Sequence, residues 1–285
     1  MSTAQRSVLI SGCSSGIGYA AALRLKRRGY RVFATARKPA DVMRLRGEGL
    51  EASLLDLTSS ASIRQCVEHV LEQSGGRLYG LFNNAGYGQP GAVEDLSREA
   101  LRVQLETNLL GTHELTRSVL PAMRAAGEGR IIVNSSVLGL IALPFRGAYC
   151  ASKFALEGLT DTLRQELRGS GVHVSLVEPG PVTSLFRENS LRAFRQHIDV
   201  DASPHRETYR AVERRLTSTG DAPFTLPADA VVKKVIKALE SGRPKPRYYV
   251  TVPTHLFGTL RRILPARWLD AALLASTAGE RKAGD

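Results

Sequence analysis

The feature that most constrains this chain is an alternation of short apolar runs with longer amphipathic segments. The apolar runs are rich in Val, Ile and Leu, as strands buried on both faces should be. Strands are predicted at 7–10, 31–36, 51–55, 80–83, 130–134, 173–177 and 247–250. Helices are predicted from about 17 to a close at Gly29, and at 59–74, 98–126, 149–168 and 228–241. This alternation implies an α/β fold with a doubly wound parallel sheet and right-handed crossovers.

Length and composition fit a single domain of this kind. The chain has 285 residues, of which 43% are apolar, enough for one large sheet with helices on both faces. We expect a main domain at 1–253 with an insertion at 184–226, and an amphipathic C-terminal extension at 254–285. No run of eighteen apolar residues or secretory h-region is present, so a cytoplasmic protein is expected.

The net charge of +12 is unevenly distributed. Residues 1–50 carry a surplus of eight positive charges and residues 242–285 a surplus of five, while the middle is nearly balanced. Nucleic-acid binding is one interpretation of such a basic chain. No helix-turn-helix, zinc finger or aromatic-basic platform accompanies the charge, so we predict no nucleic-acid partner.

The three cysteines, Cys13, Cys66 and Cys150, have no CxxC or zinc-type spacing. An odd, sparse set is typical of a reducing compartment. We favour small buried hydrophobes, with the alternative that Cys13 or Cys150 lies beside a cofactor and is oxidation-sensitive. The six histidines show no ligand spacing, so no metal is predicted.

A glycine-rich loop follows the first strand. It reads Ser11-Gly12-Cys13-Ser14-Ser15-Gly16-Ile17-Gly18. Its glycines let the backbone turn sharply and approach a pyrophosphate, and the helix from about Ile17 points free N–H groups at the phosphates. Glycines also mark ordinary tight turns. A strand before and a helix after the loop favour a Rossmann-type dinucleotide site.

The end of the second predicted strand indicates which dinucleotide binds. A fold that prefers NAD places an acid there for the ribose 2′-hydroxyl, and this sequence has none. Arg37 instead offers a planar cation suited to a 2′-phosphate, and Lys38 adds charge. We predict NADP(H), although Arg37 alone is equally compatible with a solvated surface residue.

Further motifs occur in a set order along the chain. They are Asp56-Leu57, Asn83-Asn84-Ala85-Gly86, Asn108, Ser136, Tyr149-Cys150-Ala151-Ser152-Lys153 and Pro179-Gly180. Together with the glycine-rich loop they resemble the short-chain dehydrogenase/reductase family over nearly the whole chain. Ser11 stands where that family commonly has threonine. The tail resembles bacterial NADP-dependent aldehyde reductases of the family and its hydroxysteroid and retinol dehydrogenase branch.

The resemblance implies a catalytic set of Asn108, Ser136, Tyr149 and Lys153. Tyr149 and Lys153 are four residues apart on a predicted helix, hence on one face. A nearby ammonium favours tyrosinate and lowers the tyrosine pKa from its ordinary value of about 10. Taken alone, the pair would be interpreted as a surface contact.

Each of the other members has a role implied by the family. Ser136 would hydrogen-bond the substrate oxygen, with its neighbour Ser135 structural. Asn108 would hold a helix distortion and a water linked to the lysine. The alternative for Asn108 is a helix-surface residue.

The resemblance also implies a cofactor site. Its members are Gly12, Ser14, Ser15, Gly16, Ile17, Gly18, Arg37, Lys38, Asp56, Leu57, Asn83, Asn84, Ala85, Gly86, Tyr149, Lys153, Pro179, Gly180, Val182 and Thr183. Asp56 would meet the adenine amino group, and Val182 and Thr183 the carboxamide of the nicotinamide. For Asp56 or Thr183 alone, strand-end capping is the simpler interpretation.

The expected activity is NADPH-dependent reduction of a carbonyl, with Tyr149 as the general acid and Ser136 polarising the oxygen. The 184–226 segment would be a substrate lid. Its apolar residues are Leu185, Phe186, Leu191, Phe194, Ile198, Tyr209, Val212 and Leu216. These, with Tyr87, Leu138, Leu143 and Phe145, form either a pocket for a lipophilic aldehyde or ketone, or simply core.

Several alternatives stay open. The protein could be an NADP(H)-sensing binding protein without turnover, or a hydroxysteroid or retinol dehydrogenase working in the oxidative direction. The basic amphipathic tail at 255–274 could make a weak membrane-surface contact, but a docked helix over the pocket or a subunit interface is favoured. The family resemblance implies a homodimer or homotetramer.

Overall fold

The computed structural model describes residues 5–218, 220 and 222–278, so the end of the predicted extension lies outside the described residues. Seven parallel strands form one sheet in the order β3-β2-β1-β4-β5-β6-β7. The strands are β1 (Ser7–Ile10), β2 (Arg31–Ala36), β3 (Glu51–Leu54), β4 (Gly80–Asn83), β5 (Gly129–Asn134), β6 (Val172–Glu178) and β7 (Arg247–Tyr249). The predicted doubly wound Rossmann-type fold is confirmed, with strand ends shifted by one residue at most.

Helices connect the strands and extend beyond them. They are α1 (Gly16–Arg27), α2 (Pro39–Gly47), α3 (Ser60–Gln73), α4 (Arg98–Leu105), α5 (Gly111–Ala126), α6 (Gly147–Glu166), α7 (Phe186–His197), α8 (Arg206–Thr217), α9 (Ala228–Glu240), α10 (Val252–Ile263) and α11 (Ala266–Ser276). Short turns η1 (Val93–Asp95), η2 (Glu106–Leu110) and η3 (Val137–Gly139) complete the set. The sequence analysis did not predict α2, α7 or α8 as helices.

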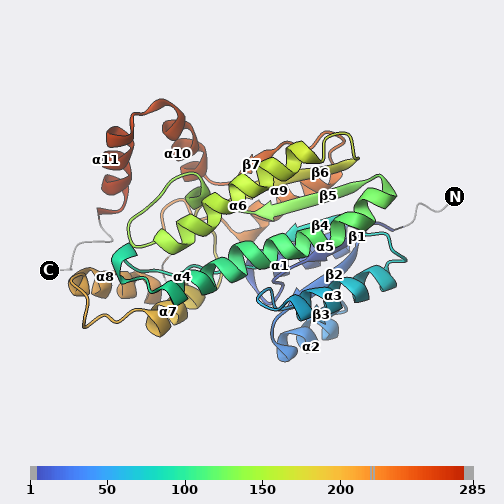
Figure 1. Cartoon of the computed structure of the whole chain (residues 1–285), viewed down its shortest axis with the longest axis horizontal. Helices are drawn as coiled ribbons and strands as arrows, with labels where there is room; N and C mark the ends of the chain where they lie inside the picture. Colours follow the sequence, from blue (N-terminus) through green and yellow to red (C-terminus); the bar gives the residue numbers. More distant parts are fainter. Residues whose placement is uncertain (1–4, 219, 221, 279–285) are drawn as a thin grey trace.

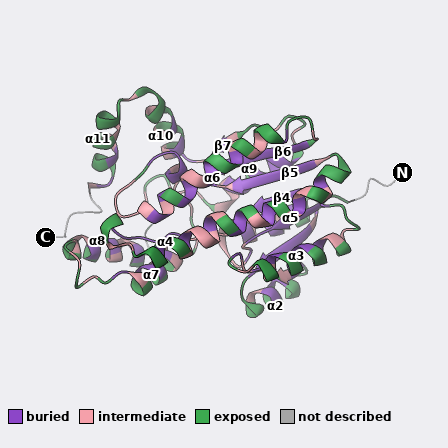
Figure 2. Cartoon of the chain, viewed as in Figure 1, coloured by how far each residue is buried: buried purple, intermediate pink, exposed green. Residues whose placement is uncertain are grey.

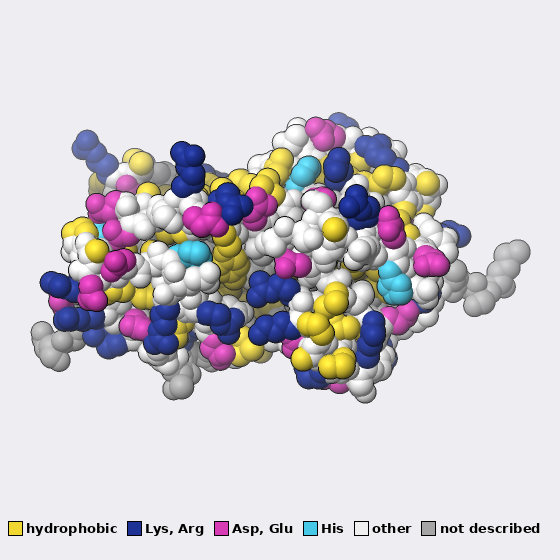
Figure 3. Space-filling view, turned by 60° about the horizontal axis from the view of Figure 1, so that its bottom comes forward, with side chains coloured by type: hydrophobic (Ala, Val, Ile, Leu, Met, Phe, Trp, Pro, Cys, Tyr) yellow, Lys and Arg dark blue, Asp and Glu magenta, His cyan; other side chains and the backbone are white. Residues whose placement is uncertain are grey.

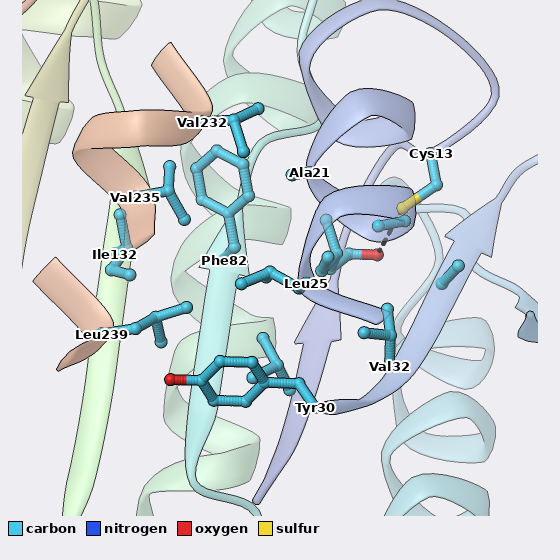
Figure 4. Close-up of a cluster of buried hydrophobic side chains, with 14 of the residues drawn as sticks. Cys13, Ala21, Leu25, Tyr30, Val32, Phe82, Ile132, Val232, Val235 and Leu239 are labelled. Atoms are coloured by element: carbon cyan, nitrogen blue, oxygen red, sulfur yellow. Dashed lines mark hydrogen bonds between the residues drawn. The ribbon is translucent and has the colours of Figure 1, made fainter. Parts of the chain in front are cut away.

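The sheet is buried between two layers of helices because its strands alternate apolar side chains between both faces. Val8 and Ile10 of β1 pack in the cluster with α1, α2 and α9, while Leu9 packs with α3, α5 and α6. Figure 4 shows the first cluster, with Leu25 of α1 and Val235 of α9 pointing at the same sheet face. The strands are accordingly the most buried part of the chain (Figure 2).

Two predicted single helices are divided in the structure. The 98–126 segment is α4 and α5 joined through the π-helical turn η2, which adds a residue to the helical turn. The tail is α10 and α11, separated at Leu264 and Pro265, because a proline after the last turn cannot continue the helix.

The additional helices gather at one end of the sheet. Figure 1 shows α7 and α8 on one side and α10 and α11 on the other, both beyond the arrowhead of β5. That is the carboxyl edge, where parallel α/β sheets bind ligands. Figure 3 shows a hollow between the two lobes of the molecule, with hydrophobic side chains exposed in it and Lys or Arg side chains at its edge.

Candidate active site

The glycine-rich loop follows β1, and its glycines leave the loop backbone without covering side chains. Gly12 and Gly16 have φ values of 73° and 59°, in the left-handed region that favours glycine. A Cβ on Gly12 would lie 2.8 Å from the Ala85 Cα, and one on Gly18 would lie 2.2 Å from the Gly12 carbonyl oxygen. Side chains are therefore excluded where a pyrophosphate would approach α1. Four residues are partly exposed at this helix end: Ser14, Ser15, Gly16 and Ile17.

The Asn83–Gly86 turn is fastened to this loop. The Ser11 hydroxyl accepts hydrogen bonds from the backbone N–H groups of Asn84 (2.9 Å) and Ala85 (3.0 Å). The Asn84 amide donates to the Gly12 carbonyl at 3.1 Å and accepts from the Asn134 amide at 3.1 Å. Asn84 thus joins the ends of β1, β4 and β5. Ser11, which stands where the family commonly has threonine, fastens the Asn83–Gly86 turn through its hydroxyl.

Two neighbouring predicted residues lie at the same turn. Asn83 is buried and its amide donates to the Thr116 hydroxyl at 2.7 Å, so its side chain braces β4 against α5. Gly86 is exposed, and a Cβ there would lie 3.1 Å from the Asn108 Oδ1.

The end of β2 carries two exposed cations, Arg37 and Lys38. A third cation, missed by sequence reasoning, lies close to the loop: an Arg44 guanidinium N–H donates to the Ser14 carbonyl at 2.7 Å. Arg44 comes from α2, which was not predicted as a helix, so nothing in the sequence indicated that Arg44 lies near the loop. Arg44 is also paired with Glu48 at 3.0 Å, so the net positive charge of this edge comes from Arg37 and Lys38.

Asp56 and Leu57 follow β3. The Asp56 carboxylate accepts hydrogen bonds from the Thr58 N–H (2.9 Å) and the Thr58 hydroxyl (2.8 Å). This is the strand-end capping that was the simpler interpretation of Asp56 alone. The residue is half-buried. The Leu57 side chain lies in the core, so only its backbone can face a ligand.

Tyr149, Lys153 and Ser136 converge beside the end of β5. The Lys153 ammonium donates to the Asn134 carbonyl at 2.7 Å and lies 5.7 Å from the centre of the Tyr149 ring. Ser136 caps η3 by accepting from the Leu138 N–H at 3.1 Å, and its hydroxyl hydrogen-bonds Tyr149. The structure therefore brings the acid, the cation and the hydroxyl together.

The expected lowering of the Tyr149 pKa is wrong for the protein as it stands. Burial raises the pKa of Tyr149 to about 12, against the opposing effect of the Ser136 hydrogen bond. Burial also lowers the pKa of Lys153 to about 8, with the Glu157 carboxylate opposing this. The reason is that the Lys153 ammonium is held by the Asn134 carbonyl, while Lys153 is buried and Tyr149 is partly buried among apolar side chains.

Asn108 lies in η2 and is buried, which contradicts the alternative of a helix-surface residue. Its amide nitrogen donates to the Tyr87 carbonyl at 2.9 Å and the Ser152 hydroxyl at 3.2 Å, and its oxygen accepts from the Tyr87 N–H at 3.1 Å. Ser152 precedes Lys153 on α6. The helix distortion at η2 therefore fastens α6 to the chain that follows β4.

The Pro179–Thr183 segment turns away from β6 at the same edge. The Pro179 carbonyl accepts from the Val137 N–H at 2.8 Å, and the Gly180 N–H donates to the Thr251 hydroxyl at 3.1 Å. A Cβ on Gly180 would lie 2.3 Å from that hydroxyl oxygen, so glycine is required here. Val182 is half-buried and Thr183 exposed, and their backbone pairs with Leu226.

The insertion divides into a small core and a face toward the site. Most of the residues of the insertion that could have lined a pocket instead form a core, which was the alternative interpretation. The buried members are Phe194, Ile198, Tyr209, Val212 and Leu216, and Leu191 and Phe145 pack against them. Leu185 and Phe186 stay exposed, and the Phe186 ring lies edge-on to the Tyr149 ring at 5.4 Å between centroids.

The tail helices close the other side. Leu273 of α11 is buried with Leu138 and Cys150, and Phe257, Leu143 and Tyr149 itself pack against this cluster. Arg261 of α10 binds the Leu140 carbonyl. The tail is thus a docked pair of helices beside Tyr149, as favoured from the sequence.

A buried ionic cluster, which sequence reasoning missed, lies behind α6. Arg247 of β7 binds Glu157 and Asp161 of α6 and, at 2.7 Å, Glu178 at the end of β6. Glu178 is fully buried, and burial together with the Glu157 charge raises its pKa to about 8, against the effect of Arg247. Nothing in the sequence motif indicated that three carboxylates share one guanidinium.

All three cysteines are buried, as expected of small hydrophobes. The Cys13 thiol donates to the Ile10 carbonyl at 3.3 Å, and burial raises its pKa to about 12, so it lacks thiolate character (Figure 4). Among the described residues, no group of three His, Cys, Asp or Glu side chains is placed to hold a metal ion. No helix in the described ranges is long and apolar enough to cross a membrane.

Comparisons with known proteins agree with this geometry. Residues 6–193 match the family model of the short chain dehydrogenases. The chain is 45% identical to the uncharacterized oxidoreductase YbbO of Escherichia coli (strain K12), over 94% of both chains. It is 36% identical to human 17-beta-hydroxysteroid dehydrogenase type 1, over 86% of this chain and 77% of that one. Human retinol dehydrogenase 8 is 35% identical over 92% of this chain and 87% of its own length.

Solved structures share the fold. A short chain dehydrogenase/reductase of Burkholderia phymatum, in complex with NAD, superposes with a TM-score of 0.76 at 26% identity, covering 99% of this chain and 97% of that chain. A short-chain dehydrogenase of Streptomyces avermitilis gives a TM-score of 0.74 at 27% identity, covering 98% and 97%.

Proposed function

Because this chain belongs to the short-chain dehydrogenase/reductase family, we propose that it is an NADPH-dependent reductase of lipophilic aldehydes or ketones. The observation that carries the proposal is the meeting of Ser136, Tyr149 and Lys153 at the carboxyl edge of the sheet, with Asn108 fastening the same helix. Family membership shows that the chain is an oxidoreductase. The proposal adds the coenzyme NADPH, the direction from carbonyl to alcohol, and the class of substrate.

The residues present fit a nicotinamide dinucleotide. Gly12 and Gly18 leave no room for a side chain beside the N-terminus of α1, which is what a bound pyrophosphate needs. Arg37 and Lys38, with no acid at the end of β2, support a 2′-phosphate and hence NADP(H). When bound, the coenzyme would supply the hydride. The NAD bound in the Burkholderia phymatum structure supports a nicotinamide dinucleotide, but it does not support NADP(H) over NAD(H).

Tyr149 is placed to donate a proton to a carbonyl oxygen. With a pKa of about 12 the hydroxyl keeps its proton at neutral pH, as a general acid must. Ser136 hydrogen-bonds the same hydroxyl, so a carbonyl oxygen between the two would accept from both as it gains negative charge. Lys153, whose pKa of about 8 leaves most of it charged at pH 7, adds a positive field near that oxygen. Alcohol oxidation would instead require Tyr149 to begin as the base.

The surroundings of Tyr149 support an apolar substrate. Phe186 of the 184–226 insertion, which we propose as the substrate lid, contacts it from one side, and the neighbouring Leu185 is exposed. Leu138 and the docked tail helices of the C-terminal extension face it from the other. Pockets of this kind bury lipophilic ligands around a few polar groups. The retinol and hydroxysteroid dehydrogenases among the relatives are consistent with that class.

The test is a turnover screen of the purified protein. Medium-chain, aromatic and retinoid aldehydes and keto-steroids are offered with NADPH and, separately, with NADH, while the matching alcohols are offered with NADP⁺. The proposal expects carbonyl reduction that is faster with NADPH. Tight NADPH binding without turnover on any carbonyl would instead indicate a cofactor-sensing protein, and turnover only of alcohols would indicate an oxidative dehydrogenase.

A further inference from the structure

A basic cleft lies at the outer edge of the sheet, away from the proposed active site. Its volume is about 350 Å³, and it is bounded by α9, β7 and α10. β7 ends the strand order, so its outer side is free of a neighbouring strand. The lining residues are Lys234, Lys237, Lys245, Arg247, Tyr248, Tyr249, His255 and Arg262. None of them belongs to the catalytic or cofactor set described above.

The cleft concentrates positive charge without an acid in its lining. In the described part of the chain, Lys234, Lys237, Lys245 and Arg262 form no ion pair with a carboxylate. Other cations that contact α9 are paired: Lys233 contacts Asp229 at 3.4 Å, and Arg28, which follows α1, contacts Glu240 at 2.7 Å. The carboxylates of α9 therefore neutralise other side chains, while the cations in the cleft repel one another.

The walls of the cleft are held in place by contacts on their inner sides. Arg247 is fixed from behind by three carboxylates, which outnumber its single charge, so the positive charge of the cleft comes from its other four cations. The Tyr248 hydroxyl accepts from the Lys245 N–H at 3.0 Å. Tyr249 packs closely on Gly258 of α10 and edge-on to His255, with ring centroids 5.4 Å apart. The cations thus surround an aromatic floor of fixed shape.

We propose that this cleft binds a phosphate-bearing anion. Four unmatched cations around one space suit a ligand with more than one negative charge, and Arg262 can hold a phosphoryl group through two parallel hydrogen bonds. The volume is that of a small-ligand site. The same phosphate chemistry is offered by a soluble phosphorylated metabolite and by the headgroup of an anionic lipid.

The lipid source has its own structural support. Successive residues on a helix are 100° apart, so Leu256 and Ile263 of α10 lie about a quarter-turn from His255 and Arg262. Ile263 is 68% exposed, and Trp268 at the start of α11 is 71% exposed. Apolar side chains beside unmatched cations are what an interfacial helix presents to an anionic membrane. A soluble ligand would make no use of Ile263 and Trp268.

Isothermal titration with inorganic pyrophosphate tests the site itself, at low salt and with saturating NADP⁺ to occupy the glycine-rich loop. Binding is expected for the unmodified protein and should weaken about tenfold or more in the variant K234Q/K237Q/R262Q, which removes three charges. The matched control is K233Q, on the same helix but paired with Asp229, and should change affinity less than about twofold.

Flotation with vesicles separates the two sources. Phosphatidylglycerol vesicles should retain the protein, phosphatidylcholine vesicles should not, and K234Q/K237Q/R262Q should abolish retention if the source is lipid. Pyrophosphate binding without vesicle binding assigns the site to a soluble phosphate. The proposal is overturned if neither probe binds, if K233Q weakens binding as much as the triple variant, or if NADP⁺ abolishes the pyrophosphate signal. Carbonyl turnover plays no part in either readout.

Discussion

The Phe186 ring, at the first residue of α7, lies edge-on to the Tyr149 ring with 5.4 Å between centroids. This contact joins the inserted segment to the proposed general acid. A Cβ on Gly88 would lie 2.8 Å from the Phe186 ring, so the chain after β4 also shapes the position of Phe186. The proposed lid and the proposed general acid are therefore in direct contact.

Replacing Phe186 by Ala should weaken substrate binding more than it slows the chemical step. If a lipophilic carbonyl packs on the Phe186 ring, a lost contact of about 0.5–1.5 kcal/mol corresponds to a KM increase of about two- to tenfold. Steady-state kinetics of F186A and the conservative F186L would measure this. A fall in kcat with unchanged KM would show that Phe186 acts on the proton donor rather than on the substrate.

Replacing Lys153 by Met should stabilise the fold and remove activity. Burial lowers the Lys153 pKa from 10.5 to about 8, so the unfolded chain binds that proton more tightly than the folded one. The resulting penalty is present below pH 8 and fades as the pH rises from 8 to 10.5. By the linkage value of about 1.4 kcal/mol per pKa unit, it amounts to about 3 kcal/mol at most.

Thermal unfolding of K153M at pH 7 and pH 10 measures this difference. Its Tm should exceed that of the unmodified protein at pH 7, and the gap should narrow at pH 10. The exposed Lys233, replaced in K233M, should leave Tm within about 2 °C. A lower Tm for K153M at both pH values would mean that the bond to the Asn134 carbonyl outweighs the burial of the charge.

Replacing Glu178 by Gln tests the buried ionic cluster. The Glu178 pKa is raised from 4.5 to about 8, so its contribution to stability is fully present below pH 4.5 and is lost as the pH rises toward and through 8. E178Q should therefore be more stable than the unmodified protein at pH 8.5 and similar to it near pH 4.5. Urea unfolding at both pH values checks this, with exposed E128Q as the control. Loss of stability in E178Q at pH 8.5 would show that Arg247 needs this carboxylate charged.

Arg37 should decide the choice of coenzyme. R37D places a carboxylate where a fold that binds NAD has one, so the ratio of kcat/KM for NADPH over NADH should fall by about tenfold or more. R27D makes the same charge change in the last turn of α1, at the far end of that helix from the loop, and should leave the ratio unchanged. An unaltered ratio in R37D would show that Arg37 does not select the coenzyme, and would point to Arg44 or Lys38 instead.

The sequence predicted most of the fold because its strands are short, apolar and separated by turn residues, and parallel connections allow few topologies. It also indicated Ser136, Tyr149 and Lys153, through the family resemblance, because the motifs that carry them occur in the order and at the spacings of that family. It did not predict α7 and α8, because their apolar residues were interpreted as pocket lining or core rather than as the buried stripes of two helices. These helices form through a small core around Tyr209, whose hydroxyl hydrogen-bonds Asp95 of η1, outside the insertion.

Electrostatic properties were harder to predict than positions. The Tyr149 pKa depends on how much water the lid, the tail and α6 exclude, and a spacing of four residues carries no information about burial. The cluster around Arg247 joins residues up to 90 positions apart, so only the assembled sheet brings them together. Asn108 was assigned by resemblance, and its buried amide contacts explain why that position matters.

The most direct test of the central claim is single-turnover kinetics of Tyr149→Phe with NADPH and a carbonyl substrate found in the screen. The account predicts that NADPH still binds, measured by fluorescence titration, while carbonyl reduction falls by at least about a hundredfold because the proton donor is gone. Reduction at the unmodified rate in Y149F would contradict the assignment of Tyr149 as the acid.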